Sequence, residues 1–212
     1  MIIDTVIDQP ILILERLKPG HETGLFGVWL TNHFQTSGKY PGHRVYYDHG
    51  DTASCDNVVV PQGFLGDKIS RETCVTNLDA MVLASDGTVA LIVEIEEKAS
   101  SPKKFLGDVF AALMCEKFAI KHPDGHHIHR VTKDTVFIVA CMVPDRGYRL
   151  KKIENAINPQ LKLFSGLPDG ISPAKVQFLF RSEIGAAIND LEAAIQSMFP
   201  VAAPNANETL AG

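Results

Sequence analysis

The sequence has no apolar run long enough to cross a lipid bilayer. The longest such runs, residues 89–93 and 136–143, are far shorter than the roughly 20 residues that a membrane-spanning helix needs. The first four residues, Met-Ile-Ile-Asp, also lack the basic segment that opens a secretory signal peptide. We therefore expect neither a membrane anchor nor a signal peptide.

Paired cysteines are absent as well. The four cysteines are far apart, at Cys55, Cys74, Cys115 and Cys141, so no Cys-x-x-Cys pair indicates a zinc knuckle or a redox motif. Three of them have apolar neighbours. Buried free thiols in a reducing cytosol are the expected state, which predicts a cytoplasmic protein.

The chain also lacks an excess of positive charge. Its formal net charge of −5 argues against a protein that coats nucleic acid without specificity, because such proteins are normally basic. An enzyme that acts on nucleic acid is not excluded, because metal-binding carboxylates lower the net charge. Gly-x-Ser-x-Gly, Walker and dinucleotide-binding motifs are missing too.

What is present is the composition of one globular domain. The 212 residues are 45% apolar and 21% charged, which fits a single domain over residues 1–200 and a flexible tail over residues 201–212. Periodicity and turn formers predict a loop over residues 48–70, helices over residues 21–35, 102–121, 149–157 and 184–199, and strands over residues 45–47, 76–84, 88–96, 135–143 and 175–180. A hairpin followed by crossovers predicts an α/β fold with a central mixed β-sheet flanked by helices.

The hairpin makes a more specific prediction. Asp86-Gly87 between two apolar runs is typical of a two-residue type I′ turn, because Gly tolerates positive φ. Ser85 would then pair with Thr88, and continuing that register places Asp79 opposite Glu94 and Asn77 opposite Glu96. Side chains opposed in this way have Cβ atoms about 4.5–5.5 Å apart.

Acidic side chains therefore meet at the end of a buried strand. Strand alternation places Glu94, Glu96 and Lys98 on one face and Glu97 on the other. Neighbouring carboxylates repel unless a cation lies between them, and Mg²⁺ prefers carboxylate oxygens. The alternative is a solvated strand end whose acids have no particular partner.

This pattern resembles the PD-(D/E)xK nuclease superfamily, whose restriction-endonuclease-like core runs helix, three antiparallel strands, helix, strand. The resemblance covers about residues 22–143. It implies a metal-dependent hydrolase of DNA phosphodiester bonds, with type II restriction endonucleases among its members. Mg²⁺ would be the cofactor, Mn²⁺ an expected substitute, and a homodimer the natural form for cutting both strands.

The resemblance also implies site residues. Asp79 would be the lone acid of the second strand, and Glu94, Glu96 and Lys98 would supply the acidic pair and its helper. Some members add an acid from the first helix, for which Glu22 is the candidate metal ligand. Asp79 follows Leu78 rather than proline.

Two overlapping frames fit the motif. Glu96-Glu97-Lys98 fits the usual order, whereas Glu94-Ile95-Glu96 fits a Glu-x-Glu variant. The hairpin register favours Glu94 as the partner of Asp79.

Basic and histidine-rich segments surround this core. Lys103 and Lys104 open the helix after the acidic strand, where an amine could meet a phosphate. A second basic patch contains Arg146, Arg149, Lys151 and Lys152. His122, His126, His127 and His129 suggest zinc, but no paired cysteine or fixed histidine spacing supports it, and an exposed turn is the prediction. With the neighbouring Lys121, Arg130 and Lys133, that turn could instead touch a nucleic-acid backbone.

Two other functions stay open at this stage. One is a catalytically silent module that keeps the nuclease fold and binds nucleic acid or a protein partner. The other is a metal-dependent enzyme that acts on a different phosphate ester.

Overall fold

The computed structural model describes residues 20–49, 56–66, 68–98, 102–143, 155–157, 159 and 170–200. The expected tail over residues 201–212 and the basic patch of Arg146, Arg149, Lys151 and Lys152 lie outside these ranges. Of the helix expected over residues 149–157, only residues 155–157 are described, and they are helical. No helix in the described ranges is both long and apolar enough to span a membrane.

The main sheet has five strands in the order β1-β4-β5-β8-β9. They are β1 (Arg44–Tyr47), β4 (Ala80–Leu83), β5 (Val89–Glu96), β8 (Val136–Met142) and β9 (Val176–Arg181). β1, β4 and β5 are antiparallel, whereas β8 and β9 run parallel to β5. The expected α/β class with a mixed sheet is therefore confirmed.

A second sheet, which the sequence did not predict, is antiparallel. Its order is β3-β2-β6-β7, formed by β2 (Pro61–Phe64), β3 (Cys74–Asn77), β6 (Lys117–His122) and β7 (Gly125–His129). The expected loop over residues 48–70 was thus wrong where β2 forms. The expected turn around the histidines is the β6–β7 hairpin.

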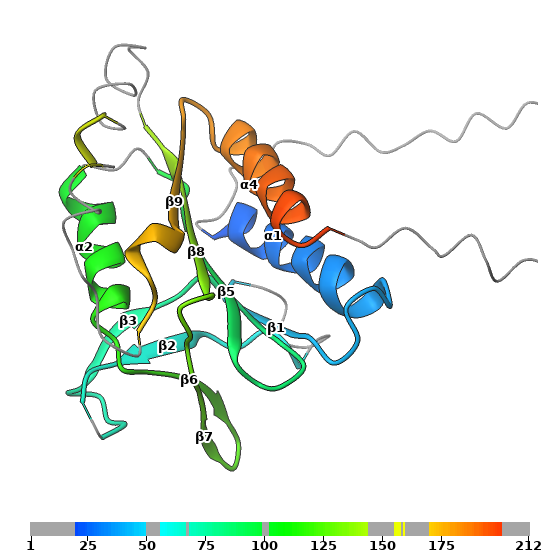
Figure 1. The fold of residues 1–212 in the computed structure, drawn as a ribbon, viewed down its shortest axis with the longest axis vertical. Helices are drawn as coiled ribbons and strands as arrows, with labels where there is room; N and C mark the ends of the chain where they lie inside the picture. Colours follow the sequence, from blue (N-terminus) through cyan, green and yellow to red (C-terminus); the bar gives the residue numbers. More distant parts are fainter. Residues whose placement is uncertain are drawn as a thin grey trace, which may run out of the picture.

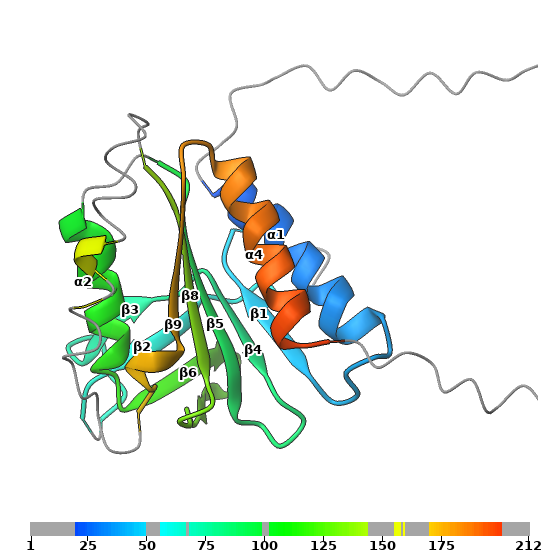
Figure 2. The same ribbon diagram turned by 45° about the horizontal axis from the view of Figure 1, so that its top comes forward.

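Three helices cover the main sheet on opposite faces. α1 (His21–Thr31) and α4 (Ile184–Met198) lie on one face, and α2 (Pro102–Leu113) lies on the other (Figures 1 and 2). α1 continues into a short π-helix (Asn32–Thr36). A 3₁₀-helix (Pro173–Lys175) leads into β9. α2 ends earlier than predicted because Lys117–His122 is drawn into the second sheet.

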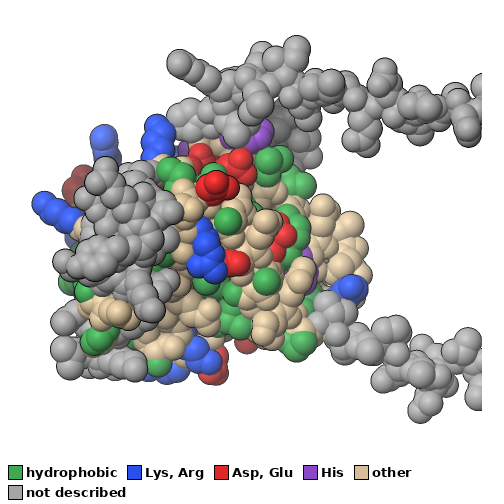
Figure 3. Space-filling model, turned by 90° about the horizontal axis from the view of Figure 1, so that it is seen from above, with side chains coloured by type: hydrophobic (Ala, Val, Ile, Leu, Met, Phe, Trp, Pro, Cys, Tyr) green, Lys and Arg blue, Asp and Glu red, His purple; other side chains and the backbone are tan. Residues whose placement is uncertain are grey.

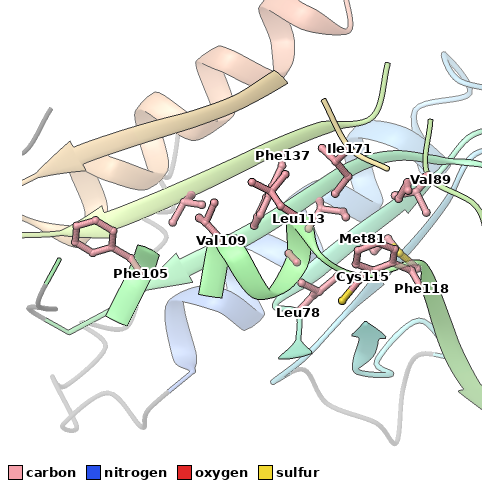
Figure 4. Close-up of a cluster of buried hydrophobic side chains, with 14 of the residues drawn as sticks. Leu78, Met81, Val89, Phe105, Val109, Leu113, Cys115, Phe118, Phe137 and Ile171 are labelled. Carbon is pink, nitrogen blue, oxygen red and sulfur yellow. The ribbon is translucent and has the colours of Figure 1, made fainter. Parts of the chain in front are cut away.

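The core has two halves because the central strands are buried on both faces. One half packs the face of α2 that carries Phe105, Val109 and Leu113 against both sheets (Figure 4). The other packs α1 and α4 against the opposite face, where Leu91, Val93 and Ile95 point. Ile92 belongs to the α2 half, so alternation assigns Glu94 and Glu96 to that same side.

The strand predicted over residues 76–84 is in fact two strands in different sheets. The break falls at Leu78 and Asp79, where the Leu78 amide donates to the Pro61 carbonyl at 2.8 Å. The Asp48 amide donates to the Asp79 carbonyl at 2.9 Å. Asp79 therefore occupies the junction between the two sheets.

The turn between β4 and β5 also differs from the prediction. The Ala84 amide donates to Thr88 at 2.8 Å and the Gly87 amide donates to Ala84 at 2.9 Å, so the loop has three residues, with Gly87 at φ 83°. The pairing shifts by one residue between Leu83 and Val82, which leaves Ala90 as a β-bulge. The longer loop and the bulge cancel, so the predicted register holds at Met81–Ile92 and Ala80–Val93.

Candidate functional site

Four acidic side chains converge where β5 ends, β4 begins and α2 starts. Asp79 immediately precedes β4, Glu94 and Glu96 end β5, and Asp108 lies on α2. Figure 3 looks onto this end of the molecule and shows acidic side chains gathered beside histidine. These acids line a cavity of about 350 Å³, together with Lys98, Lys104 and His49.

Asp79 is held by the strand opposite it. The Ile95 amide donates to its Oδ2 atom at 2.6 Å, which fixes the carboxyl group over the end of β5. Burial raises the pKa of Asp79 to about 6, although the hydrogen bonds from Ile95 and Glu94 and the nearby His49 act to lower it. Asp79 is therefore a carboxylate whose charge is poorly solvated.

Glu94 is hydrogen-bonded to Asp79, as the hairpin register predicted. Burial, followed by the charges of Asp79 and Asp108, raises the pKa of Glu94 well above its usual value. The protonated form of Glu94 is therefore favoured, and in that form its hydroxyl can donate to Asp79. Its Oε1 atom is buried, and among the described residues it has no hydrogen-bond partner.

Glu96 lies in a second group with two residues of α2. Lys104 Nζ donates to both carboxylate oxygens of Glu96, at 2.5 and 2.6 Å. Asp108 is hydrogen-bonded to Glu96, and burial followed by that contact raises the pKa of Asp108. Two carboxyl pairs at the end of β5 therefore share the cavity with one well-placed amine.

Glu97 points away from this cluster, as alternation predicted. Its Oε2 accepts from the Gly20 amide at 2.9 Å, and its Oε1 accepts from the amide and hydroxyl of Thr23 at 2.8 and 3.0 Å. Glu97 thus caps the first turn of α1, where free amides favour an anion. This contact joins α1 to the end of β5.

The other two predicted site residues are less well placed. Lys98 lines the cavity but lies beyond the end of β5 and is exposed, and among the described residues it forms no ion pair. Glu22 is in the first turn of α1 and is not among the residues that line the cavity. The frame Glu94-Ile95-Glu96 supplies two acids that reach the cluster, whereas the lysine of the frame Glu96-Glu97-Lys98 lies exposed beyond the end of β5.

The carboxyl oxygens of this cluster are the kind of donor atom that a hard divalent cation prefers. Such ions take carboxylate oxygens, and they relieve the repulsion that otherwise keeps buried carboxyl groups protonated. The unpartnered Oε1 of Glu94 is the atom most in need of such a partner. Within the described ranges, however, no three His, Cys, Asp or Glu side chains are already arranged around one metal position.

Sequence reasoning missed Asp108 as a member of this cluster. The signal was its spacing: Lys104 and Asp108 are four residues apart, so they share one face of α2. Which strand that face would meet could not be read from spacing alone. Lys104 itself was expected to meet a phosphate, and here it is paired with Glu96.

A larger cavity, of about 700 Å³, lies at the opposite end of the main sheet. Its two acids are already engaged: Asp86 accepts from Thr88, and Asp134 is 4.0 Å from the amine of Lys175. The smaller cavity is therefore the better candidate for chemistry, because its carboxyl groups are crowded and incompletely partnered.

Comparison of the chain with protein-family models, with curated proteins and with solved structures found no match.

Proposed function

We propose that this protein is a metal-dependent nuclease of the PD-(D/E)xK type that hydrolyses DNA phosphodiester bonds. The observation that carries the proposal is the hydrogen-bonded pair of Asp79 and Glu94, with one buried, unpartnered carboxyl oxygen among the described residues. With the strands of the second sheet left out, the order α1, β1, β4, β5, α2, β8 supports it, because the superfamily core runs helix, three antiparallel strands, helix, strand.

Asp79, Glu94 and Glu96 are the residues proposed to hold Mg²⁺, with Mn²⁺ as a substitute. When bound, such an ion polarises a phosphoryl oxygen and lowers the pKa of a water molecule. For this, Glu94 must release to solvent the proton that it donates to Asp79. The Ile95 amide then keeps Asp79 in place while its charge changes.

Lys104 is proposed to take the role that the motif gives to its lysine. Its amine is fixed against Glu96 at the cavity, whereas Lys98 lies past the strand end. A cation there offsets the charge that develops on a phosphodiester during attack. Lys104 also belongs to the first turn of α2, where the helix dipole favours anions.

Double-strand cleavage needs two such centres. A two-fold homodimer supplies them with one centre for each strand. The homodimer and the DNA substrate, including a restriction endonuclease's sequence specificity, are parts of the same proposal.

A catalytically silent module is the second candidate. The specific observation in its favour is the Lys104–Glu96 ion pair, which occupies both oxygens of one expected ligand. Metal-dependent cleavage separates the two functions.

The test is cleavage of supercoiled plasmid DNA by the purified chain with Mg²⁺ or Mn²⁺. The wild type is expected to nick or linearise the plasmid. Asp79→Ala and Glu94→Gln are each expected to reduce cleavage by about 100-fold or more, because a metal ligand is lost. Glu116→Gln is the matched control, since this acid is exposed and does not line the cavity.

Two results would overturn the proposal at different points. If the wild type cuts no DNA with either metal, the catalytically silent module becomes the supported function. If cleavage persists in both Asp79→Ala and Glu94→Gln, these two acids are not needed for catalysis.

A further inference from the structure

The β6–β7 hairpin places three histidines on one face. Its register pairs Phe118 with His129, Ile120 with His127 and His122 with Gly125. Opposed residues in an antiparallel pair point to the same side, so His122, His127 and His129 share the side of Phe118 and Ile120. Lys121 pairs with His126, which therefore points to the opposite side.

Two of the three rings lie close together. The ring centroids of His122 and His127 are 4.3 Å apart. His127 and His129 are two residues apart on β7, which places them side by side on one strand face. A His-x-His pair on one strand with a third histidine from its neighbour can surround a single ion.

Each of two rings has one nitrogen engaged and the other available. His129 Nδ1 lies 3.2 Å from the Gly87 carbonyl oxygen, so it donates there, while Nε2 is buried and has no partner among the described residues. His127 Nε2 lies 3.1 Å from the Asp124 carboxylate. Metal-binding histidines typically donate their second N–H to a carbonyl or carboxylate in this way, because that contact fixes the tautomer and the ring.

The hairpin is anchored to the main sheet at this point. The Val89 amide donates to the Arg130 carbonyl at 2.8 Å, directly after β7. Burial lowers the pKa of His129 and the charges of nearby histidines add to this, although the hydrogen bond to Gly87 acts to raise it; the net lowering favours the neutral ring that a metal ion needs.

We propose that His122, His127 and His129 form a binding site for a divalent transition-metal ion of the zinc class, with water as the fourth ligand. Three imidazoles and a water suit Zn²⁺ or Co²⁺, whereas Mg²⁺ prefers oxygen. The tilted rings of His122 and His127 must turn toward His129, because the described side chains are not yet grouped around an ion. His127 is exposed, and exposed side chains make such rotations within nanoseconds.

This site is separate from the acid cluster. His129 contacts the turn that precedes β5, whereas the acids lie at the end of β5, about 20 Å away along the strand. A bound ion would fasten the β6–β7 hairpin next to the β4–β5 turn, which predicts a stabilising role.

The test is titration of the chelator-treated, tag-free protein with Zn²⁺ by calorimetry and with Co²⁺ by visible absorption. One equivalent of each ion is expected, with the intense bands of four-coordinate cobalt. His127→Ala and His129→Ala should each weaken binding more than about 10-fold, since even the loss of a ligand's hydrogen-bond partner costs that much. His126→Ala is the matched control, because it lies on the same hairpin but on the other face.

Because His127 is exposed, His127→Ala should leave folding unchanged, and an unchanged melting temperature without metal checks this. Binding should also persist in the Asp79→Ala variant, which distinguishes this site from the acid cluster. The proposal is overturned if the wild type binds neither ion, or if binding is the same in His126→Ala as in His127→Ala and His129→Ala.

Discussion

Asp79 and Glu94 are hydrogen-bonded in a place where water cannot fully solvate two charges. Burial is the largest cause of the raised pKa of each residue, and the neighbouring acids add to the effect on Glu94. Crowded, buried carboxyl groups lower the free energy of unfolding. They are nevertheless common at functional sites, where their perturbed pKa values serve the chemistry. The effect on folding stability should be measurable.

The stability of the metal-free protein should fall as the pH rises through about 6. The folded-state pKa of Asp79 is raised from 3.8 to about 6, so folding favours its protonated form. The stabilisation is full below the unfolded-state pKa and is lost above the folded-state pKa, a change of about 3 kcal/mol. Melting temperatures in chelator at pH 5 and pH 7.5 capture about half of this change, because pH 5 already lies above the unfolded-state pKa.

Asp79→Asn provides the control for that pH dependence. It removes the titrating group and keeps an oxygen that can accept from the Ile95 amide. The pH dependence should shrink in this variant. An identical profile in wild type and Asp79→Asn would contradict the assignment of the effect to Asp79.

At the scale of elements, one acid connects a helix to a strand. Glu97 follows β5 directly and accepts three hydrogen bonds from the first turn of α1. α1 otherwise has no side-chain cap, because its N-cap position is Gly20. The contact therefore decides where α1 begins relative to the acidic end of the sheet.

Glu97→Ala should destabilise the protein by about 1–2 kcal/mol. It removes the acceptor from two backbone amides and from the buried hydroxyl of Thr23. Urea unfolding monitored by circular dichroism measures the loss. Glu22→Ala, in the same helical turn, is the control and should change stability much less. Equal effects of the two substitutions would argue against the cap.

At the scale of the whole molecule, three layers must fit closely. α1 lies so near β1 that a Cβ atom at Gly27 would come within 2.0 Å of the buried ring of Tyr47. On the opposite face, Gly107 of α2 has nothing within 4 Å of such an atom. Close packing therefore does not account for the glycine at position 107.

Gly27→Ala and Gly107→Ala should have opposite effects. The first should destabilise by about 1–3 kcal/mol or more, because the Tyr47 ring must move. The second should stabilise by about 0.5–1 kcal/mol, because alanine loses less entropy in a helix. Thermal unfolding of the two variants tests this, and destabilisation by both would contradict the described packing of α2.

The sequence by itself determined the local features. β5 was predicted in full because its apolar run and its charged end lie within one short segment, and the helix beginning at Pro102 was predicted from its first residues. The juxtaposition of Asp79 and Glu94 was also predicted, although the prediction assumed a two-residue turn. The protein reaches the same register with a longer turn and a bulge at Ala90.

Only the tertiary structure decided which distant segments meet. The division of residues 76–84 between two sheets depends on β2, which pairs with β3 and β6 across the chain. Asp108 and Lys104 joined the acids because α2 packs on that face, and the three histidines share a face because Lys117–His122 became a strand. Spacing fixes neighbours within one element, whereas burial of apolar faces against one another fixes neighbours between elements, and that needs the whole chain.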